Sequence, residues 1–211
     1  MDKAKQIKLQ RFVDDIASEV DLTPEIYKAF ASIEREIFVP QGLKHWAYKL
    51  DALPIKANQW ISSPITVAKM TLYLEPENAD NVLEIGCGSG YQAAILSKLV
   101  RRVFTIERIE TLLKEAKERF KILEIDNIHT RLGDGQRGWR QYAPYDRILF
   151  SASTKRVPDT IFEQLADGGI LVAPIEKGNE QIITQFAKKG KDITEIPKES
   201  CLFVPVKDGV E

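Results

Sequence analysis

The sequence predicts an α/β protein: a mostly parallel β-sheet with helices on both faces, an N-terminal helical appendage and an antiparallel closing edge. From about residue 81, short apolar segments alternate with amphipathic ones, the pattern of strands joined by helical crossovers. A glycine cluster, Gly86 to Gly90, directly follows the first of these strands. Of the 211 residues, 44% are hydrophobic and 29% charged, which excludes a disordered chain and allows one domain with a large core.

The N-terminal third is predicted to be largely helical. Apolar residues recur at helical spacing from Ile7 to Val20, and Thr23-Pro24 is typical of an N-cap followed by a proline in the first helical turn. The segment 37–60 has no sustained period and contains two prolines, so we expect it to be irregular. The expected helices cover 3–20, 24–33 and 64–74.

The remaining elements follow as alternating strands and helices. Val82 to Ile85 is a short apolar strand, and each later strand is rich in β-branched or aromatic residues. Beyond Gly178 the helical pattern stops, which indicates closing antiparallel strands. The expected strands are 82–85, 102–106, 128–132, 145–150, 170–175, 181–186 and 201–206. The expected helices are 91–100, 109–123 and 159–165.

The charge and cysteine content exclude several classes of protein. Thirty basic and thirty-one acidic residues leave a net charge of −1, so we expect no nucleic-acid partner. The two cysteines, Cys87 and Cys201, have no metal-ligand spacing; we expect reduced thiols and no metal. No apolar run reaches the length of a membrane span, and the charged start of the chain has no apolar leader behind it. We therefore expect a cytoplasmic protein with no membrane partner.

The glycine cluster is a candidate cofactor site. It lies where a strand turns into a helix, the place where nucleotide cofactors bind in such sheets. Glu84 precedes it, and a carboxylate about 4 Å from a phosphate costs roughly 1–4 kcal/mol, whereas beside an ammonium it is favourable by a similar amount. S-adenosyl-L-methionine carries an α-ammonium and no phosphate, so Glu84 favours it over NAD. The alternative is a plain tight turn with Glu84 as a cap or an ion-pair partner. The candidate cofactor-binding residues here are Glu84, Gly86, Gly88, Ser89 and Gly90.

Two further acids follow the next two strands. Glu107 ends the second strand, where a carboxylate can accept both hydroxyls of a ribose, although this contact does not distinguish the two cofactors. Its alternative is a solvent-facing start to the next helix. Asp134 precedes Gly135 after the third strand and can accept a hydrogen bond from an adenine amino group; its alternative is an Asp-Gly turn.

The run from Glu84 to Asp134 resembles the Rossmann-like S-adenosylmethionine-dependent methyltransferases. From about residue 30 to about residue 206, the chain more specifically resembles the protein-L-isoaspartate O-methyltransferase family. The matching stretches are 35–40, 52–55, 59–64, 67–71, 82–93, 106–108, 133–135, 144–146, 165–169 and 203–205. The resemblance also puts Arg108 and Gly135 among the cofactor-binding residues. It implies one compact unit of two parts: N-terminal helices with a loop that covers cofactor and acceptor (1–78), and the Rossmann-like core (79–211).

The resemblance implies a reaction and its acceptor site. In the family, the segment matching 59–70 forms a loop and helix that close over the cofactor and present a serine to the acceptor. Ser62 occupies that serine's place and is the candidate catalytic residue. The implied reaction is methyl transfer from S-adenosyl-L-methionine to the free carboxylate of isoaspartyl residues in peptides and proteins, which begins their repair. The candidate acceptor-binding residues are Ile61, Ser62, Ser63, Pro64 and Val204. We expect a monomer.

The implied reaction is compatible with a sequence that has no evident catalytic base. A carboxylate is already ionised at pH 7, so no strong general base is needed, and neither His45 nor His129 has a triad-like context. The chain departs from the family pattern at Trp60, at Ser63 and in the 151–155 turn, all around the acceptor. Two alternatives therefore stay open: a methyltransferase for a small molecule or an RNA, and a module that binds the cofactor without turnover.

Overall fold

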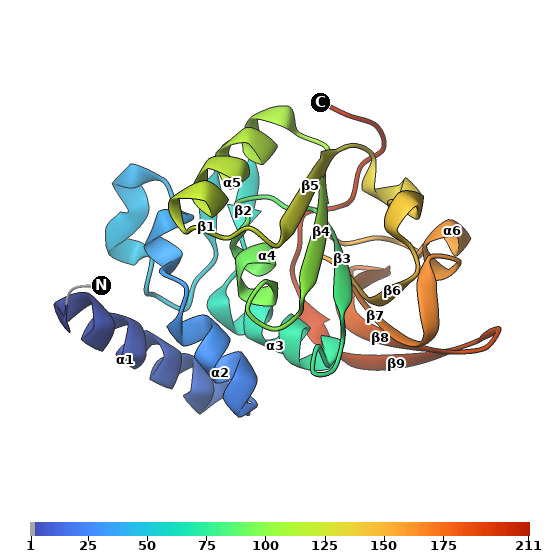
Figure 1. The fold of residues 1–211 in the computed structure, drawn as a ribbon, viewed down its shortest axis with the longest axis horizontal. Helices are drawn as coiled ribbons and strands as arrows, with labels where there is room; N and C mark the ends of the chain where they lie inside the picture. The colour runs from blue at the N-terminus through green and yellow to red at the C-terminus, as the bar shows by residue number, and fades with distance from the viewer. Residues whose placement is uncertain (1–2) are drawn as a thin grey trace.

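The computed structural model describes residues 3–211, and the expected charged start at Met1 and Asp2 lies outside them. The predicted fold class is confirmed: a seven-stranded sheet has the order β5-β4-β3-β6-β7-β8-β9, with five parallel strands and two antiparallel strands at one edge (Figure 1). The helices are α1 (Lys3–Glu19), α2 (Pro24–Ala31), α3 (Pro64–Leu74), α4 (Tyr91–Leu96), α5 (Glu110–Ile122) and α6 (Asp159–Phe162). The sheet strands are β3 (Asn81–Ile85), β4 (Arg102–Glu107), β5 (Ile128–Leu132), β6 (Tyr145–Phe150), β7 (Leu165–Lys177), β8 (Glu180–Lys189) and β9 (Asp192–Cys201).

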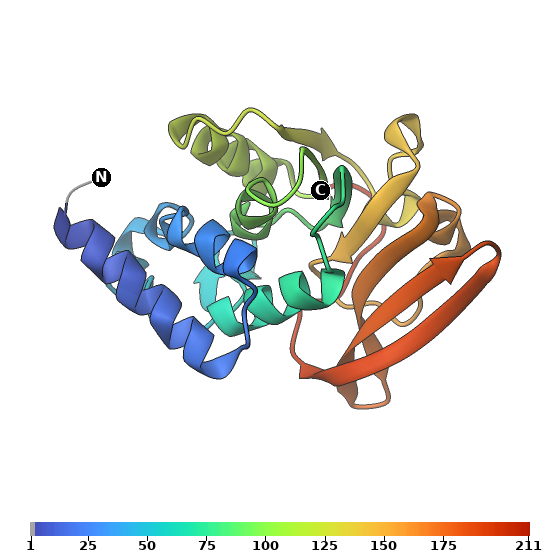
Figure 2. The same cartoon turned by 60° about the horizontal axis from the view of Figure 1, so that its bottom comes forward.

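The N-terminal helices form a layer beside the sheet rather than a separate body. The apolar face of α1, which includes Phe12 and Ile16, is buried. The predicted N-cap of α2 is confirmed, because the Ile26 N–H donates to Thr23 Oγ1 at 3.3 Å. Both helices pack on α3, and α2 also reaches α4, so the appendage joins the core next to the helix that follows the glycine loop (Figures 1 and 2).

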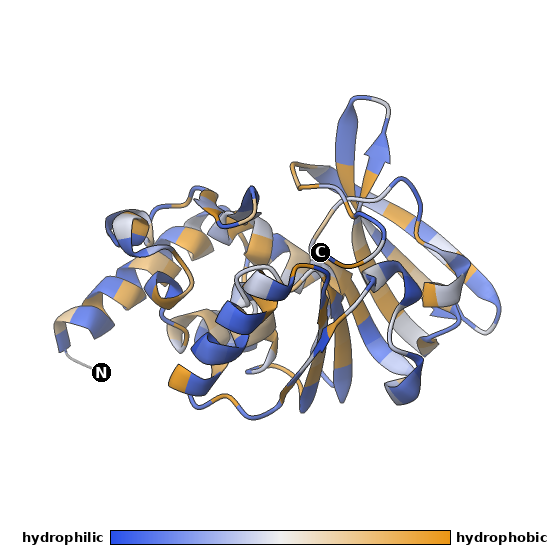
Figure 3. Ribbon diagram, turned by 90° about the horizontal axis from the view of Figure 1, so that it is seen from above, coloured by the Kyte–Doolittle hydropathy of each residue, from blue (hydrophilic) through white to orange (hydrophobic). Residues whose placement is uncertain are grey.

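Alternate residues of the strands pack into two different cores. Val82 belongs to the core shared with α1–α5, whereas its neighbour Leu83 points to the opposite face of the sheet. That second face is covered by α6 and by the segment around Trp139. The central strands are accordingly rich in hydrophobic residues, while the helices also carry hydrophilic ones (Figure 3).

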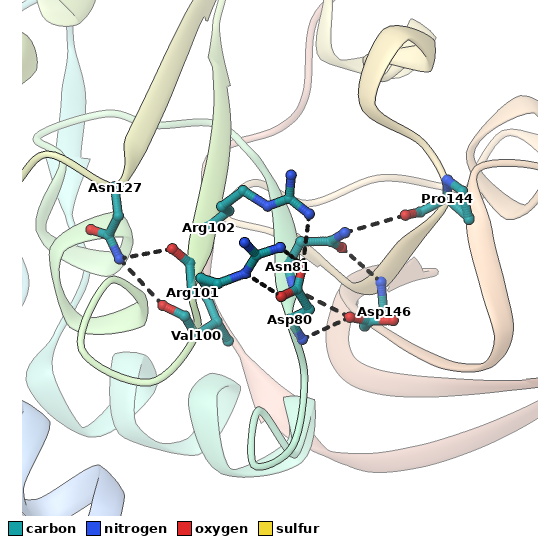
Figure 4. Close-up of polar contacts among 8 residues, drawn as sticks. All are labelled: Asp80, Asn81, Val100, Arg101, Arg102, Asn127, Pro144 and Asp146. Atoms are coloured by element: carbon teal, nitrogen blue, oxygen red, sulfur yellow. Dashed lines mark hydrogen bonds and ion pairs between the residues drawn. The ribbon is translucent and has the colours of Figure 1, made fainter.

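A polar network ties together the ends of β3, β4 and β6 that lie away from the glycine loop (Figure 4). Asp146 accepts the backbone N–H groups of Asp80 and Asn81 at 2.7 and 3.2 Å. The Asp80 carboxylate in turn pairs with Arg101 and Arg102, which hold its pKa at about 2 through hydrogen bonds and charge. These contacts fix the relative register of the three strands whose opposite ends carry the site.

Several sequence-based boundaries were wrong. The last strand was expected at 201–206, but β9 ends at Cys201, and beyond it only an isolated bridge pairs Ser153 with Pro205. The helix expected over 159–165 ends at Phe162, because Leu165 already pairs with Tyr145 as the start of β7.

Two further differences concern shorter segments. The helix expected over 91–100 ends at Leu96 and continues as turns. The segment expected to be irregular, 37–60, contains a 3₁₀ helix (Gln41–Trp46) and most of an antiparallel hairpin of β1 (Leu53–Ile55) and β2 (Gln59–Ile61). Among residues 3–211, no helix combines the length and the apolar character that a bilayer crossing requires.

Candidate active site

A cleft opens at the carboxyl ends of β3, β4 and β6. Its floor is the glycine loop after β3 together with the end of β4, which is where ligands bind in open α/β sheets. One wall is the acceptor loop, which we define as residues 59–63, and the facing wall is the segment 203–207. Two parts of the chain that are far apart in sequence therefore close over one cavity.

The glycine loop is held by its own backbone. The N–H groups of Gly86 and Cys87 both donate to Ile106 O, at 2.9 and 3.2 Å, which anchors the loop to β4. Gly90 is required by packing, since its φ is +89° and a Cβ there would lie 2.8 Å from the ring of Phe120 on α5. Gly90 thus lets α4 start close to α5 and does not line the cleft, whereas Gly86, Gly88 and Ser89 do.

Glu84 is fully buried under the cleft, although it contributes to its lining. Its carboxyl group accepts the Thr105 hydroxyl at 2.6 Å and the Ser151 hydroxyl at 3.0 Å. Burial raises the pKa of Glu84 to about 8; the two hydroxyls oppose this and the Glu107 charge adds to it. Among the described residues, no cation pairs with it. The site therefore holds an acid that lacks a positive partner.

The Glu107 carboxylate accepts hydrogen bonds from three backbone N–H groups. Oε2 accepts the Gly88 N–H at 2.7 Å, and Oε1 accepts those of Arg108 and Ile109 at 2.8 and 3.0 Å. A carboxylate has about four acceptor positions, so roughly one stays free for a ligand hydroxyl. The group lines the cleft and is 5% exposed, which excludes the alternative of a solvent-facing helix start.

Asp134 does not line the cleft, although the neighbouring Gly135 does. Its Oδ1 caps a short turn by accepting the Gln136 N–H at 3.0 Å, and its Oδ2 accepts the Gly209 N–H at 3.2 Å. Both oxygens are thus in use within the chain, as the Asp-Gly turn alternative expects. The adenine contact of Asp134 stays a prediction. Arg108 does line the cleft, and its guanidinium pairs with Glu211 at 2.8 Å.

The acceptor loop places its residues in two different roles. Ile61, Ser62 and Val204 all line the cleft. Ser63 and Pro64 do not line it. Ser63 is instead the N-cap of α3, with its Oγ accepting the Thr66 N–H at 3.1 Å, and Pro64 is the buried first residue of that helix.

Sequence reasoning missed two groups that complete the site, Thr105 and Ser151. Thr105 pairs with Glu84 in the register of β3 and β4, and Ser151 follows the end of β6, the other neighbour of β3. The order of parallel strands would have identified both. The two histidines lie outside the cleft, and the ring of His129 stacks on Phe104 with 5.0 Å between centroids.

A model of the family described as protein-L-isoaspartate(D-aspartate) O-methyltransferase matches residues 9–211. A protein-L-isoaspartate O-methyltransferase from Helicobacter pylori (strain J99) is 55% identical over 206 residues, which cover 97% of this chain and 99% of that one. One from Maricaulis maris is 47% identical over 185 residues, covering 88% and 87%.

Solved structures of similar proteins have the same fold. A protein-L-isoaspartate O-methyltransferase superposes with a TM-score of 0.85 at 27% identity, covering 93% of this chain and 65% of that chain. A putative Plasmodium falciparum member in complex with S-adenosyl-L-homocysteine has the same fold, with a TM-score of 0.83 at 20% identity, covering 94% and 98%. The chain belongs to the protein-L-isoaspartate(D-aspartate) O-methyltransferase family.

Proposed function

We propose that the cleft between the glycine loop and the acceptor loop is where this protein methylates the free carboxylate of L-isoaspartyl residues in damaged proteins. As a member of its family, the protein is an S-adenosylmethionine-dependent protein carboxyl O-methyltransferase. The observation that carries the assignment of the site is that Glu84, Glu107 and Ser62 line one cavity.

The donor set under the cleft suits S-adenosyl-L-methionine. Glu84 is a buried carboxyl group without a cationic partner among residues 3–211, and the α-ammonium of the cofactor supplies that charge. Glu107 offers an acceptor to a ribose hydroxyl, and Gly88, where a Cβ would meet nothing within 4 Å, leaves room above the loop. When bound, the cofactor supplies a sulfonium methyl group and a neutral thioether leaving group.

The protein's own part in the reaction is to bind and orient the acceptor. An isoaspartyl carboxylate is ionised at neutral pH and attacks without losing a proton, which agrees with a cleft that no histidine lines. The Ser62 hydroxyl and a neighbouring backbone N–H hold one carboxylate oxygen, which turns the other toward the methyl donor. Such positioning supplies most of the rate enhancement in a bimolecular transfer. The methoxy group of the ester is a better leaving group than the hydroxyl of the free acid, so the adjacent backbone nitrogen attacks the ester carbonyl, releases methanol and closes a succinimide, which water then opens partly to aspartate.

A pair of peptides that differ only in Asp or isoAsp at one position tests this function. Incubation with methyl-labelled S-adenosyl-L-methionine is expected to give a base-labile methyl ester on the isoAsp peptide alone. Equal methylation of both peptides would contradict isoaspartyl repair and favour another acceptor. Binding of S-adenosyl-L-homocysteine with methylation of neither peptide would favour a different acceptor or a module without turnover.

We further propose that the protein is a cytoplasmic monomer and that it has no nucleic-acid partner. The near-zero net charge and the two unpaired thiols, one buried and one half-buried, support this. Light scattering on the purified protein tests the monomer, cell fractionation tests the location, and a retardation assay with single- and double-stranded nucleic acid tests the last point.

A further inference from the structure

Arg35 is the largest fully buried side chain among residues 3–211, and it does not line the cleft. Its Nη1 donates to Ala47 O at 2.7 Å and to Lys49 O at 3.3 Å. Its Nη2 donates to Asp51 O at 3.0 Å and to Ser62 O at 3.1 Å. One guanidinium therefore gathers the irregular segment 47–51 and the acceptor loop around a single centre.

No carboxylate among the described residues pairs with Arg35, and its Nε has no partner. Burial disfavours the charged guanidinium, and the backbone carbonyl dipoles offset this cost together with the Tyr91 side chain and the charge of Asp51. Lysine has three donors on a single nitrogen and cannot reproduce four bonds in this fork. The guanidinium carbon also lies 5.8 Å from the ring centroid of Tyr91, the first residue of α4 after the glycine loop. Arg35 thus joins the acceptor loop to the helix that begins at the cofactor site.

The bond to Ser62 O has a consequence for the acceptor. In a trans peptide the N–H points opposite to the C=O, so the Ser63 N–H faces away from Arg35. Neither this N–H nor the Ser62 hydroxyl has a hydrogen-bond partner among residues 3–211. A charged donor on the carbonyl also polarises the peptide group and strengthens its N–H as a donor.

We propose that Arg35 is a positioning residue for methyl transfer: its guanidinium fixes the Ser62–Ser63 peptide group so that the Ser62 hydroxyl, which lines the cleft, is presented to the acceptor carboxylate. The proposal rests on the proposed function for the identity of the acceptor. It separates two tasks, because Arg35 orders the acceptor loop whereas Glu84 and Glu107 bind the cofactor.

The test compares Arg35→Lys and Arg35→Met with Arg147→Met. Arg147 is a matched control, since it is half-buried and also donates to two carbonyls, Glu75 O and Asp146 O, away from the acceptor loop. With the cofactor saturating, which stabilises the folded state, both Arg35 variants are expected to lose roughly 10- to 100-fold in kcat/KM for an isoAsp peptide. The Kd of S-adenosyl-L-homocysteine is expected to stay within about threefold of wild type, and Arg147→Met is expected to keep its kcat/KM.

A double-mutant cycle with Ser62→Ala separates positioning from general stability. Ser62→Ala keeps the carbonyl that Arg35 binds, so the combined variant is expected to lose little more than the worse single variant. Fully multiplicative losses would overturn the proposal. So would failure of both Arg35 variants to fold with cofactor, which would make Arg35 a residue of the fold alone.

Hydrogen exchange tests Arg35 without any turnover. The amides of the β1–β2 hairpin, which runs into Ser62, are expected to exchange faster in Arg35→Lys than in wild type and in Arg147→Met, with the glycine loop unchanged. If wild type methylates no isoAsp peptide, the proposed function fails, but this exchange measurement still decides the role of Arg35. Unchanged exchange in the hairpin would overturn the proposal.

Discussion

The carboxylate of Glu107 accepts the backbone N–H of Gly88 at 2.7 Å, so the acid that ends β4 fixes the middle of the glycine loop that follows β3. The same carboxylate accepts two further N–H groups at the start of α5. Glu107 therefore shapes the cofactor site as well as contributing an acceptor to it.

Glu107→Gln is expected to weaken binding of S-adenosyl-L-homocysteine by on the order of 1–3 kcal/mol, because a charged acceptor is lost from both the loop and the ribose. Isothermal calorimetry measures this. Glu110→Gln is the control, since Glu110 is exposed and its carboxylate pairs with Lys114 at 3.1 Å along α5. Equal affinity in Glu107→Gln and in the control would show that Glu107 does not bind the cofactor. Tighter binding of NAD than of S-adenosyl-L-homocysteine to wild type would contradict the cofactor itself.

Glu84 makes the stability of the ligand-free protein depend on pH. Its pKa is about 8 in the fold, above the ordinary value of 4.5, so the folded state holds a proton that the unfolded state has released between these values. The unfolding free energy is therefore expected to fall from about pH 4.5 to about pH 8 by on the order of 5 kcal/mol, and Glu84→Gln is expected to remove this fall. Urea unfolding at a series of pH values measures the difference between the two proteins. Identical pH profiles would contradict a protonated Glu84.

Cofactor affinity is expected to show the opposite dependence. The cofactor ammonium favours the ionised form of Glu84, so binding of S-adenosyl-L-homocysteine strengthens as the pH rises toward about 8. Below that pH, the affinity is expected to fall by roughly tenfold per pH unit. Calorimetry in buffers of different ionisation enthalpy counts the protons released on binding. Binding without proton release at pH 7 would show that Glu84 is already ionised.

Glu84 and Glu107, the two acids near strand ends, could be identified from the sequence because the local sequence pattern determines where their strands end. A short apolar strand followed by Gly86 to Gly90 defines the carboxyl end of β3, and parallel pairing puts Glu107 at the same edge. The contacts of Asp134 could not be found in this way. One of its oxygens accepts the N–H of Gly209, 75 residues away, from a segment without regular secondary structure.

The role of Arg35 could not be identified from the sequence, for a related reason. Its hydrogen-bond partners are backbone carbonyls, which every residue has, so residue types in the sequence do not identify them. The end of β9 at Cys201 was also missed, since the apolar residues from Phe203 to Val206 line the cleft rather than extend the ladder. An apolar run of this length is compatible with either use.

Cys87 is expected to be dispensable for activity. Its side chain is 4% exposed, and burial, with the nearby charges of Glu84 and Glu107, raises the pKa of its thiol well above the ordinary value. The reactive thiolate is therefore suppressed. Cys87→Ser is expected to keep most of the activity with an isoAsp peptide, as is the control Cys201→Ser. A loss of about a thousand-fold in a folded Cys87→Ser protein would reveal covalent chemistry.

Ser62 and Ser63 are adjacent, yet the structure gives their hydroxyls different tasks. Ser62 lines the cleft, whereas Ser63 Oγ accepts the Thr66 N–H at 3.1 Å as the N-cap of α3. Ser62→Ala is expected to lower turnover of an isoAsp peptide by roughly 10- to 1,000-fold, the range of a positioning hydrogen bond, with cofactor affinity and unfolding free energy little changed. Ser63→Ala is expected to lower the unfolding free energy by about 1 kcal/mol through loss of the cap, with a smaller effect on turnover. Steady-state kinetics and urea unfolding of both variants separate the two roles. The reverse assignment, with Ser63 controlling turnover and Ser62 controlling stability, would mean that the acceptor approaches from the α3 side of the loop.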